Sequence, residues 1–139
     1  MFDYHDKLNE LIKRVEENLQ HLSETKENYL HQVTLPKSPG VYMLFFDGQL
    51  QYIGSSGNLN ERIRANLIRG NRNSHTLINK LCELKRWKSQ EAVNFLKSNA
   101  TIKFVKTNTE EDAKVLEDTL ISMYHTLYNI PLRKLKKTR

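Results

Sequence analysis

The chain has 139 residues, of which 38% are hydrophobic. This is enough for one domain with a core, but too short for a multi-domain enzyme. No apolar run approaches the roughly 18 residues of a membrane span, and no apolar segment follows the N-terminus as a signal peptide would require. The single cysteine, Cys82, excludes an internal disulfide framework and an ordinary cysteine-based zinc site. We therefore expect a cytoplasmic protein.

The net charge of +6 is unevenly distributed. Residues 1–31 carry four Lys and Arg against seven Asp and Glu, whereas residues 32–139 carry eighteen against nine. The basic excess therefore lies wholly in the second part. Such an asymmetry indicates a polyanionic partner, most simply nucleic acid.

Residues 4–31 are predicted to form one long amphipathic helix. Apolar residues recur at three- and four-residue steps without an intervening Gly or Pro, which is typical of one buried helix face. They are Leu8, Leu11, Ile12, Val15, Leu19, Leu22 and Tyr29. The helix can pack on the domain or on a second copy of itself, and its acidic balance disfavours a DNA-contacting arm. Residues 32–39, with Pro36 and Pro39, form a short extended link.

A β-hairpin is predicted around Asp47-Gly48. This pair accepts the positive φ values of a tight type I′ turn, and apolar segments flank it on both sides. Alternation along the first strand places an apolar set on each face: Tyr42, Leu44 and Phe46 on one, and Val41, Met43 and Phe45 on the other. The hairpin should therefore be the buried centre of a small sheet.

A helix should follow the hairpin, because residues 55–58 have turn and cap chemistry and Leu59, Ile63 and Leu67 recur at helical spacing. Arg62 lies at the flank of this stripe, where its guanidinium can reach a groove beside the sheet.

A polar stretch then leads to a helix over about 75–87, capped by Asn73 or Ser74. His75 lies in its first turn, where a helix N-terminus favours anions and lowers a histidine pKa. A lone histidine there is, however, usually a solvated residue. A short helix from Gln90 to Lys97 and a third strand from Ala100 to Lys106 complete the middle of the chain.

The last predicted helix begins after Thr109, with Asp112 as the acidic half of a capping box. Its buried stripe runs through Ala113, Leu116, Leu120 and Tyr124. Glu117 lies at the edge of this stripe, where a carboxylate costs free energy unless a positive group offsets its desolvation. Two readings remain: an exposed glutamate whose stem lies along the core, or a ligand.

Several segments together resemble the GIY-YIG nuclease family. Gly40-Val41-Tyr42 and Tyr52-Ile53-Gly54 match its two triplets, Arg62 matches its helical arginine, and the segment 112–121 is similar to its last motif. The resemblance covers about residues 38–131 and implies an α/β (α+β) fold with a small three-stranded antiparallel sheet flanked by helices. The long N-terminal helix lies outside it.

The resemblance also implies a catalytic set. Glu117 would bind one Mg²⁺ or Mn²⁺, a cation that neutralises phosphoryl charge and assists the leaving oxygen. Arg62 would clamp the phosphate, because its guanidinium is planar and always charged. Tyr42 is the candidate general base towards water, and Tyr52 would bind the phosphate or share that role. His75 would bind phosphate or protonate the leaving oxygen.

Other residues are expected to support this set. Gly40, Gly54 and Asn129 are structural, and Asn129 ties the chain end back to the hairpin as in the family. The DNA-binding candidates are Arg64, Arg69, Arg72, Lys85, Arg86 and Lys134. One departure matters, since a lysine often follows the second triplet in the excision-repair members, and Ser55 stands here instead. The Gly-Ser-Ser start looks more like the homing and small phage-type nucleases.

The sequence thus predicts three parts: a helical extension over 1–31, a nuclease domain over 32–131 and a basic tail over 132–139. The tail should be disordered, or hold DNA nonspecifically. The predicted function is a metal-dependent DNA endonuclease, with no membrane partner and with a homodimer through the N-terminal helix as an option. The alternatives are a catalytically inactive nucleic-acid-binding module and a subunit of a larger DNA-processing complex.

Overall fold

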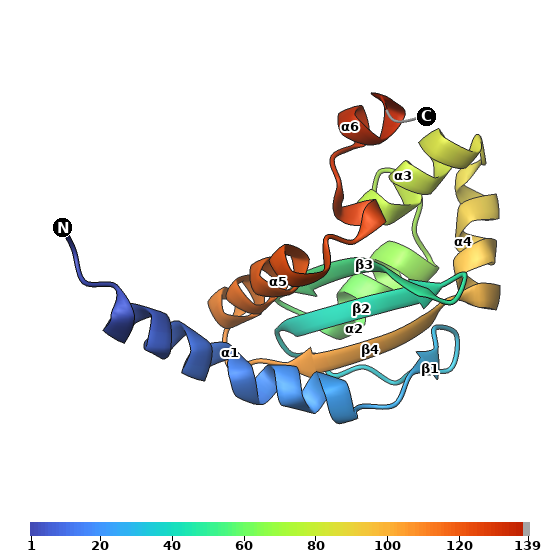
Figure 1. Cartoon of the computed structure of the whole chain (residues 1–139). Helices are drawn as coiled ribbons and strands as arrows, with labels where there is room; N and C mark the ends of the chain where they lie inside the picture. The colour runs from blue at the N-terminus through green and yellow to red at the C-terminus, as the bar shows by residue number, and fades with distance from the viewer. Residues whose placement is uncertain (138–139) are drawn as a thin grey trace.

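A four-stranded antiparallel sheet forms the middle of the molecule (Figure 1). The computed structural model describes residues 1–137. The strands, in the spatial order β1-β4-β2-β3, are β1 Asn28–Tyr29, β4 Thr101–Lys106, β2 Gly40–Phe46 and β3 Gln49–Ser56. The predicted mixed fold and its three main strands are confirmed. The short strand β1 is an addition, because the chain leaving the first helix pairs Asn28 and Tyr29 with β4.

The predicted hairpin turn is present between β2 and β3. Asp47 and Gly48 have φ values of 55° and 72°, as a type I′ turn requires. β2 lies inside the sheet between β4 and β3, and apolar side chains cover both of its faces. β3 is an edge strand, so one side of its backbone faces away from the sheet.

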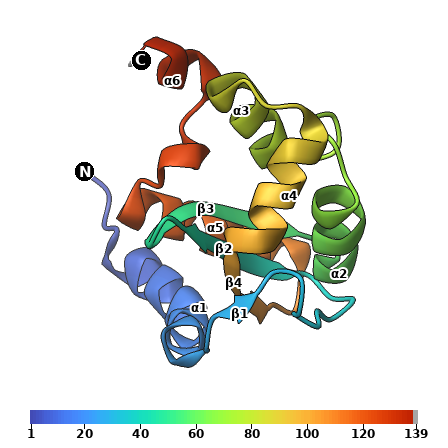
Figure 2. The same ribbon diagram turned by 90° about the vertical axis from the view of Figure 1, so that its right-hand side faces the viewer.

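Helices cover both faces of the sheet (Figure 2). One face packs against α2 Leu59–Glu61, the π-helical turn η1 Arg62–Ile68, α3 Thr76–Lys85 and α4 Ser89–Asn99. The opposite face packs against α1 His5–Glu24 and α5 Glu110–Tyr124. The chain closes with η2 Leu127–Asn129 and α6 Leu132–Lys137.

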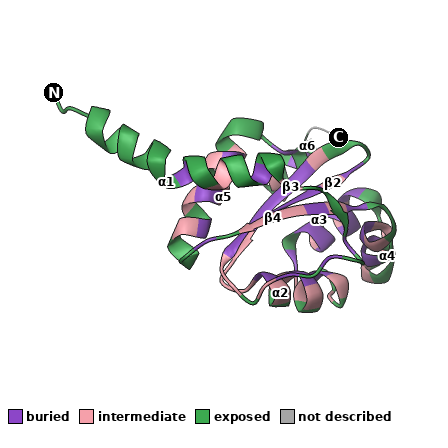
Figure 3. Ribbon diagram, turned by 90° about the horizontal axis from the view of Figure 1, so that it is seen from below, coloured by how far each residue is buried: buried purple, intermediate pink, exposed green. Residues whose placement is uncertain are grey.

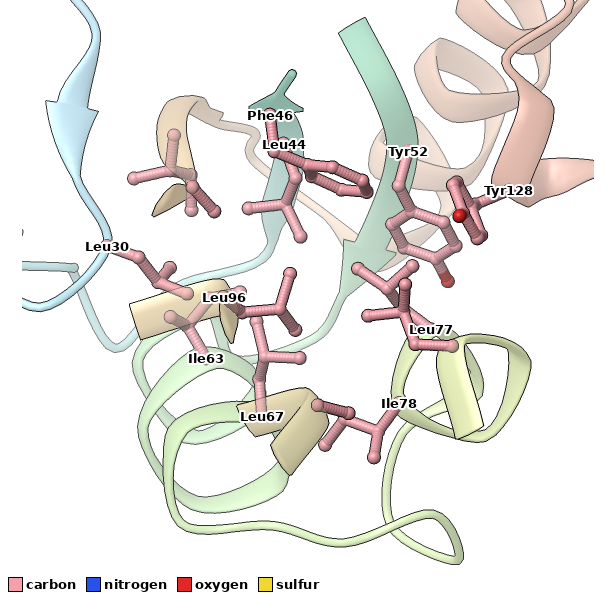
Figure 4. Close-up of a cluster of buried hydrophobic side chains, with 14 of the residues drawn as sticks. Leu30, Leu44, Phe46, Tyr52, Ile63, Leu67, Leu77, Ile78, Leu96 and Tyr128 are labelled. Carbon is pink, nitrogen blue, oxygen red and sulfur yellow. The ribbon is translucent and has the colours of Figure 1, made fainter. Parts of the chain in front are cut away.

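Two apolar cores result, one on each face. The larger contains Leu44, Phe46, Ile63, Leu67 and Leu77, all of which are buried (Figure 4). The smaller joins the alternate residues of the same strands to α1 and α5; its members are Val15, Leu22, Val41, Met43, Ile53, Ala113, Leu116 and Leu120. The period-two pattern of β2 is therefore confirmed on both faces.

The two ends of the chain differ from the sequence prediction. α1 ends at Glu24 instead of continuing to residue 31, because residues 28–29 extend to join the sheet. The tail was expected to be disordered, yet residues 132–137 form α6 and bury Leu135. The last two residues of the predicted tail lie outside the described residues. Within residues 1–137, no helix combines the length and apolar character needed to cross a bilayer.

Asn129 completes the exposed edge of β3. Its Oδ1 accepts a hydrogen bond from the Ile53 N–H at 2.8 Å, and its Nδ2 donates to the Ile53 carbonyl at 2.7 Å. Thr126 also donates to Oδ1. One amide side chain thus satisfies both backbone groups of Ile53 as a neighbouring strand would. This fixes η2 against the second triplet.

Replacing Asn129 by Ala should lower the free energy of unfolding by about 2–4 kcal/mol, because two part-buried backbone groups lose their partner. Urea denaturation followed by circular dichroism measures this. Asn99→Ala is the matched control, since Asn99 donates only to the carbonyl of Phe95 on an exposed helix end. If Asn129→Ala lowers the free energy of unfolding no more than Asn99→Ala does, the edge-closing role of Asn129 is contradicted.

Candidate active site

The tyrosine of the first triplet lies across the glycine of the second. Tyr42 and Gly54 are direct partners in the β2–β3 ladder, and Tyr42 is completely buried. A Cβ atom on Gly54 would stand 2.3 Å from Cζ of Tyr42 and 2.4 Å from its hydroxyl oxygen. The ring can therefore cross β3 only because residue 54 has no side chain. Gly40 is equally crowded, with the Val105 carbonyl 2.4 Å from its would-be Cβ.

Tyr52 lies beside Tyr42 on the same face of the sheet. The ring centroids are 6.2 Å apart, and Tyr52 is only 7% exposed. Figure 4 shows its ring directed toward Leu77 at the start of α3. Burial raises the pKa of the Tyr52 phenol, the Arg62 guanidinium lowers it, and the Glu117 carboxylate raises it.

His75 is the N-cap of α3 and faces the two tyrosines. Its Nδ1 accepts a hydrogen bond from the backbone N–H of Leu77 at 3.1 Å, and its Nε2 lies 2.9 Å from the Tyr42 hydroxyl. Because a backbone N–H can only donate, the neutral ring carries its proton on Nε2 and donates it to Tyr42. Burial, together with the charge of Arg62, lowers the His75 pKa to about 3.

This position of His75 differs from the sequence prediction in two ways. The predicted cap was Asn73 or Ser74, whereas His75 itself caps α3. The histidine was also expected at the surface or on a phosphate, yet it is 2% exposed and in contact with Tyr42. A polar stretch followed by a helix indicates that a cap is present, but not which way the cap residue faces.

Arg62 is the first residue of the π-helical turn η1. Its Nη1 donates to the carbonyl of Ser74 at 3.0 Å, which directs the guanidinium toward the tyrosines. Burial raises the Tyr42 pKa far above its usual value, and neighbouring Tyr52 adds to the rise. The Arg62 guanidinium opposes it through its charge and through hydrogen bonding.

Glu117 reaches the same place from the other side of the sheet. It belongs to α5, which packs on the smaller core, but its Oε2 accepts hydrogen bonds from Ser55 Oγ at 2.8 Å and Lys114 Nζ at 2.9 Å. Because Ser55 is near the end of edge strand β3, the carboxylate lies close enough to raise the pKa values of Tyr42 and Tyr52. The Arg62 guanidinium and the Glu117 carboxylate therefore both lie within electrostatic range of the two phenols.

The donor set is compatible with one hard divalent cation. Among residues 1–137, no three or more His, Cys, Asp or Glu side chains form a metal-binding group, and Glu117 is the one carboxylate in this set of side chains. Mg²⁺ commonly uses one or two carboxylates and completes an octahedral shell with water and substrate phosphate. The Glu117 side chain is 13% exposed, which leaves it accessible to such a partly hydrated ion.

The six DNA-binding candidates fall into two groups. Arg64 donates to the Val33 carbonyl, and Arg72 pairs with Asn79 and Glu83, so both have partners within the fold. The other four are exposed. Arg69 follows η1, Lys85 and Arg86 lie at the end of α3, and Lys134 belongs to α6.

Sequence reasoning missed two contacts of the site. The sequence marks Ser55 only as a departure from a lysine and assigns no role to Lys114. The signal for Lys114 was available, because residues three apart on a helix are neighbours and Lys114 precedes Glu117 by three. The signal for Ser55 was not, because it depends on how α5 lies against β3.

Comparison with known proteins finds curated relatives over most of this chain. No family model matches the chain. The UvrABC system protein C of Campylobacter jejuni is 38% identical over 117 residues, which covers 78% of this chain and 17% of that protein. The protein of the same name from Flavobacterium johnsoniae is 32% identical over 107 residues, which covers 75% of this chain and 15% of that protein. The one from Geobacter metallireducens is 31% identical over 102 residues, which covers 72% of this chain and 14% of that protein. The chain thus spans less than a fifth of the length of these relatives.

Solved structures with a similar fold include the GIY-YIG N-terminal endonuclease domain of UvrC from Thermotoga maritima bound to magnesium. It is 23% identical, with a TM-score of 0.46, and the match covers 73% of this chain and 91% of that one. The match to UvrC proteins over most of this chain supports the resemblance to the GIY-YIG nuclease family. Within this family Ser55 favoured a homing or phage-type relative, whereas the relatives named above are UvrC proteins.

The buried neutral state of His75 predicts a pH dependence of stability. Its pKa is about 3 in the folded protein and about 6.5 when unfolded, so the unfolded chain binds the proton first. Stability should therefore fall as pH drops from 6.5 toward 3. His75→Asn keeps a capping oxygen but cannot titrate. Between pH 7.5 and 4.5 its free energy of unfolding should therefore fall by about 2 kcal/mol less than that of wild type.

Urea unfolding at the two pH values measures the difference. His125→Asn is the control, because His125 is exposed and has φ 48°, a conformation that asparagine also tolerates. Equal acid sensitivity in the His75 variant, the His125 variant and wild type would rule out a buried neutral histidine.

Proposed function

We propose that this protein is a metal-dependent endonuclease that hydrolyses phosphodiester bonds in DNA. The observation that carries the proposal is the convergence of two phenols, Arg62 and Glu117, with both phenol pKa values responding to both charged groups. Similarity to UvrC proteins over most of the chain supports the same activity. The net charge of +6 suits a polyanionic substrate.

Tyr42 is proposed as the general base that takes a proton from the attacking water. Burial opposes this role, because it raises the pKa of the phenol and so disfavours the phenolate. Two groups favour the phenolate. One is the Arg62 charge, which lowers the Tyr42 pKa. The other is the Nε2–H of neutral His75, which donates to the Tyr42 oxygen at 2.9 Å. His75 thus stabilises the basic form of Tyr42 and holds its ring, and does not itself accept the proton.

Arg62 is proposed to bind the scissile phosphate, with Tyr52 as a hydrogen-bond donor beside it. Ser74 accepts a hydrogen bond from Nη1 and both phenols also interact with the guanidinium, so the phosphate is proposed to bind the N–H groups that remain. A divalent cation held by Glu117 would neutralise charge on the phosphoryl group and lower the pKa of bound water. Mg²⁺ or Mn²⁺ fits a site with one carboxylate.

The exposed basic residues are proposed to hold the DNA backbone. Arg69, Lys85, Arg86 and Lys134 are exposed, so their charges can replace counterions along the phosphates. Arg64 and Arg72 contribute less in this proposal, because each already has a partner in the fold.

Plasmid nicking with Mg²⁺ or Mn²⁺ tests the enzyme. Arg62→Ala and Glu117→Ala should each reduce the nicking rate by about 10²-fold or more, as expected when one charge-stabilising group is removed. Lys26→Ala, in the exposed link between α1 and β1, should nick like wild type. Thermal unfolding of each variant shows whether the fold is intact.

Two alternatives would be supported by other outcomes. Wild-type protein that retains DNA without cutting it would be a binding module, and protein without affinity for DNA would be a subunit whose substrate recognition lies elsewhere. Cleavage that survives both substitutions would reject the proposed site.

We also propose that two copies associate through α1. Its first half projects from the body, and Leu8, Leu11 and Ile12 are 42–46% exposed on one stripe (Figure 3). The stripe continues into Val15 and Leu22, which are buried against the domain. A hollow of about 330 Å³ lies beside that buried half, lined mainly by apolar residues of α1, α5 and the hairpin. One chain thus offers both a projecting apolar stripe and an apolar hollow, which two copies related by a two-fold axis can satisfy mutually.

Such pairing would place two sites on one duplex and permit a double-strand cut. Leu11→Glu should convert the dimer to a monomer in light scattering coupled to size exclusion, whereas Asn9→Glu, an equal charge change at another exposed position of α1, should not. A wild-type protein that is monomeric at high micromolar concentration would contradict the pairing.

A further inference from the structure

Lys114 forms an ion pair with the carboxylate that the proposed function assigns to the metal. Its Nζ lies 2.9 Å from Oε2 of Glu117, and Ser55 Oγ lies 2.8 Å from the same oxygen. In the described chain, the hydrogen bonds to this carboxylate end on Oε2, so Oε1 is the oxygen free for another ligand. A charged donor and a neutral donor therefore share one carboxylate oxygen.

The two partners of the ion pair differ in exposure. The Glu117 side chain is 13% exposed and held by Ser55, whereas the Lys114 side chain is 64% exposed. Lys114 is also 3.4 Å from Asp118, whose side chain is 63% exposed. The ammonium can thus leave Glu117 and remain paired with Asp118 one residue further along the helix.

We propose that Lys114 is a built-in competitor of the divalent cation, and that it sets the cation concentration at which the site fills. The proposal rests on the proposed function, because it takes Glu117 as the metal ligand. An ammonium 2.9 Å from a carboxylate neutralises it and repels a second cation. Cation binding therefore requires Lys114 to move away, and Asp118 offers it a second partner.

Ser55 is proposed to act in the opposite direction as a positioning residue. Its hydroxyl donates to Oε2 without adding charge, so it can stay in place while a cation occupies Oε1. It orients the carboxylate toward the tyrosines from the end of β3. Two donors on one oxygen should therefore affect cation affinity with opposite signs.

Mn²⁺ titration, with free ion followed by electron paramagnetic resonance, measures this without turnover. Lys114→Met should bind Mn²⁺ about two- to fivefold more tightly than wild type, as the loss of a partly exposed ion pair implies. Ser55→Ala should bind it about two- to fivefold more weakly. Asp118→Asn should also weaken binding, because the displaced lysine loses its second partner.

Controls separate this mechanism from a general charge effect and from failure of the site itself. Lys106→Met removes an exposed positive charge at the end of β4 and should leave Mn²⁺ affinity unchanged. Glu117→Gln should abolish the binding. Retention of affinity by Glu117→Gln would reject the proposed metal site. Loss in Glu117→Gln with unchanged or weaker affinity in Lys114→Met would reject only the competition.

Discussion

The packing of the Tyr42 ring on the bare backbone of Gly54 is the constraint on which the site depends. The two residues face each other across the β2–β3 ladder, and any side chain at position 54 would occupy the space of the phenol. The first triplet, through Tyr42, and the second, through Gly54, are therefore one structural unit in this protein. The Tyr42 ring, carried by β2, can cross the edge strand β3 only where β3 has no side chain in its path. The hairpin register places Gly54 at that point.

The site also brings together elements that pack on opposite faces of the sheet. The tyrosines, His75 and Arg62 belong to the larger core and its helices, whereas Glu117 comes from α5 on the smaller core. They meet at the edge of the sheet, because in the part of the chain that the structure describes no further strand lies beside β3 to separate Glu117 on α5 from the groups on the other face. Ser55 joins Glu117 to this strand, and Asn129 closes the next part of its edge. Support of the edge is thus part of building the site.

Local signals account for what could be predicted from the sequence. Asp47-Gly48 specifies its turn through the φ values it tolerates, and Leu59, Ile63 and Leu67 specify a helix through their spacing. Thr109 caps α5 as expected, since its hydroxyl accepts from the Asp112 N–H. These features depend on a few neighbouring residues. The residues of the catalytic set were named through the resemblance, because spacing alone does not reveal which side chains meet.

Features that depend on tertiary contact were not predictable in this way. The inward orientation of His75 follows from the packing of α3 on Tyr42, and the end of α1 follows from the pairing of Asn28 with Ile102. α6 likewise forms where Leu135 is buried in the larger core, although the charged sequence of this segment predicts a disordered tail. In each case a distant partner overrides the local pattern.

The central claim is that Glu117 holds a divalent cation beside Tyr42, Tyr52 and Arg62. Anomalous diffraction from a crystal soaked in Mn²⁺ tests it most directly. The account predicts a peak about 2.0–2.2 Å from a carboxylate oxygen of Glu117 on the side facing the two tyrosines. A well-ordered crystal at saturating Mn²⁺ with no peak at Glu117, or with the strongest peak elsewhere, would contradict it.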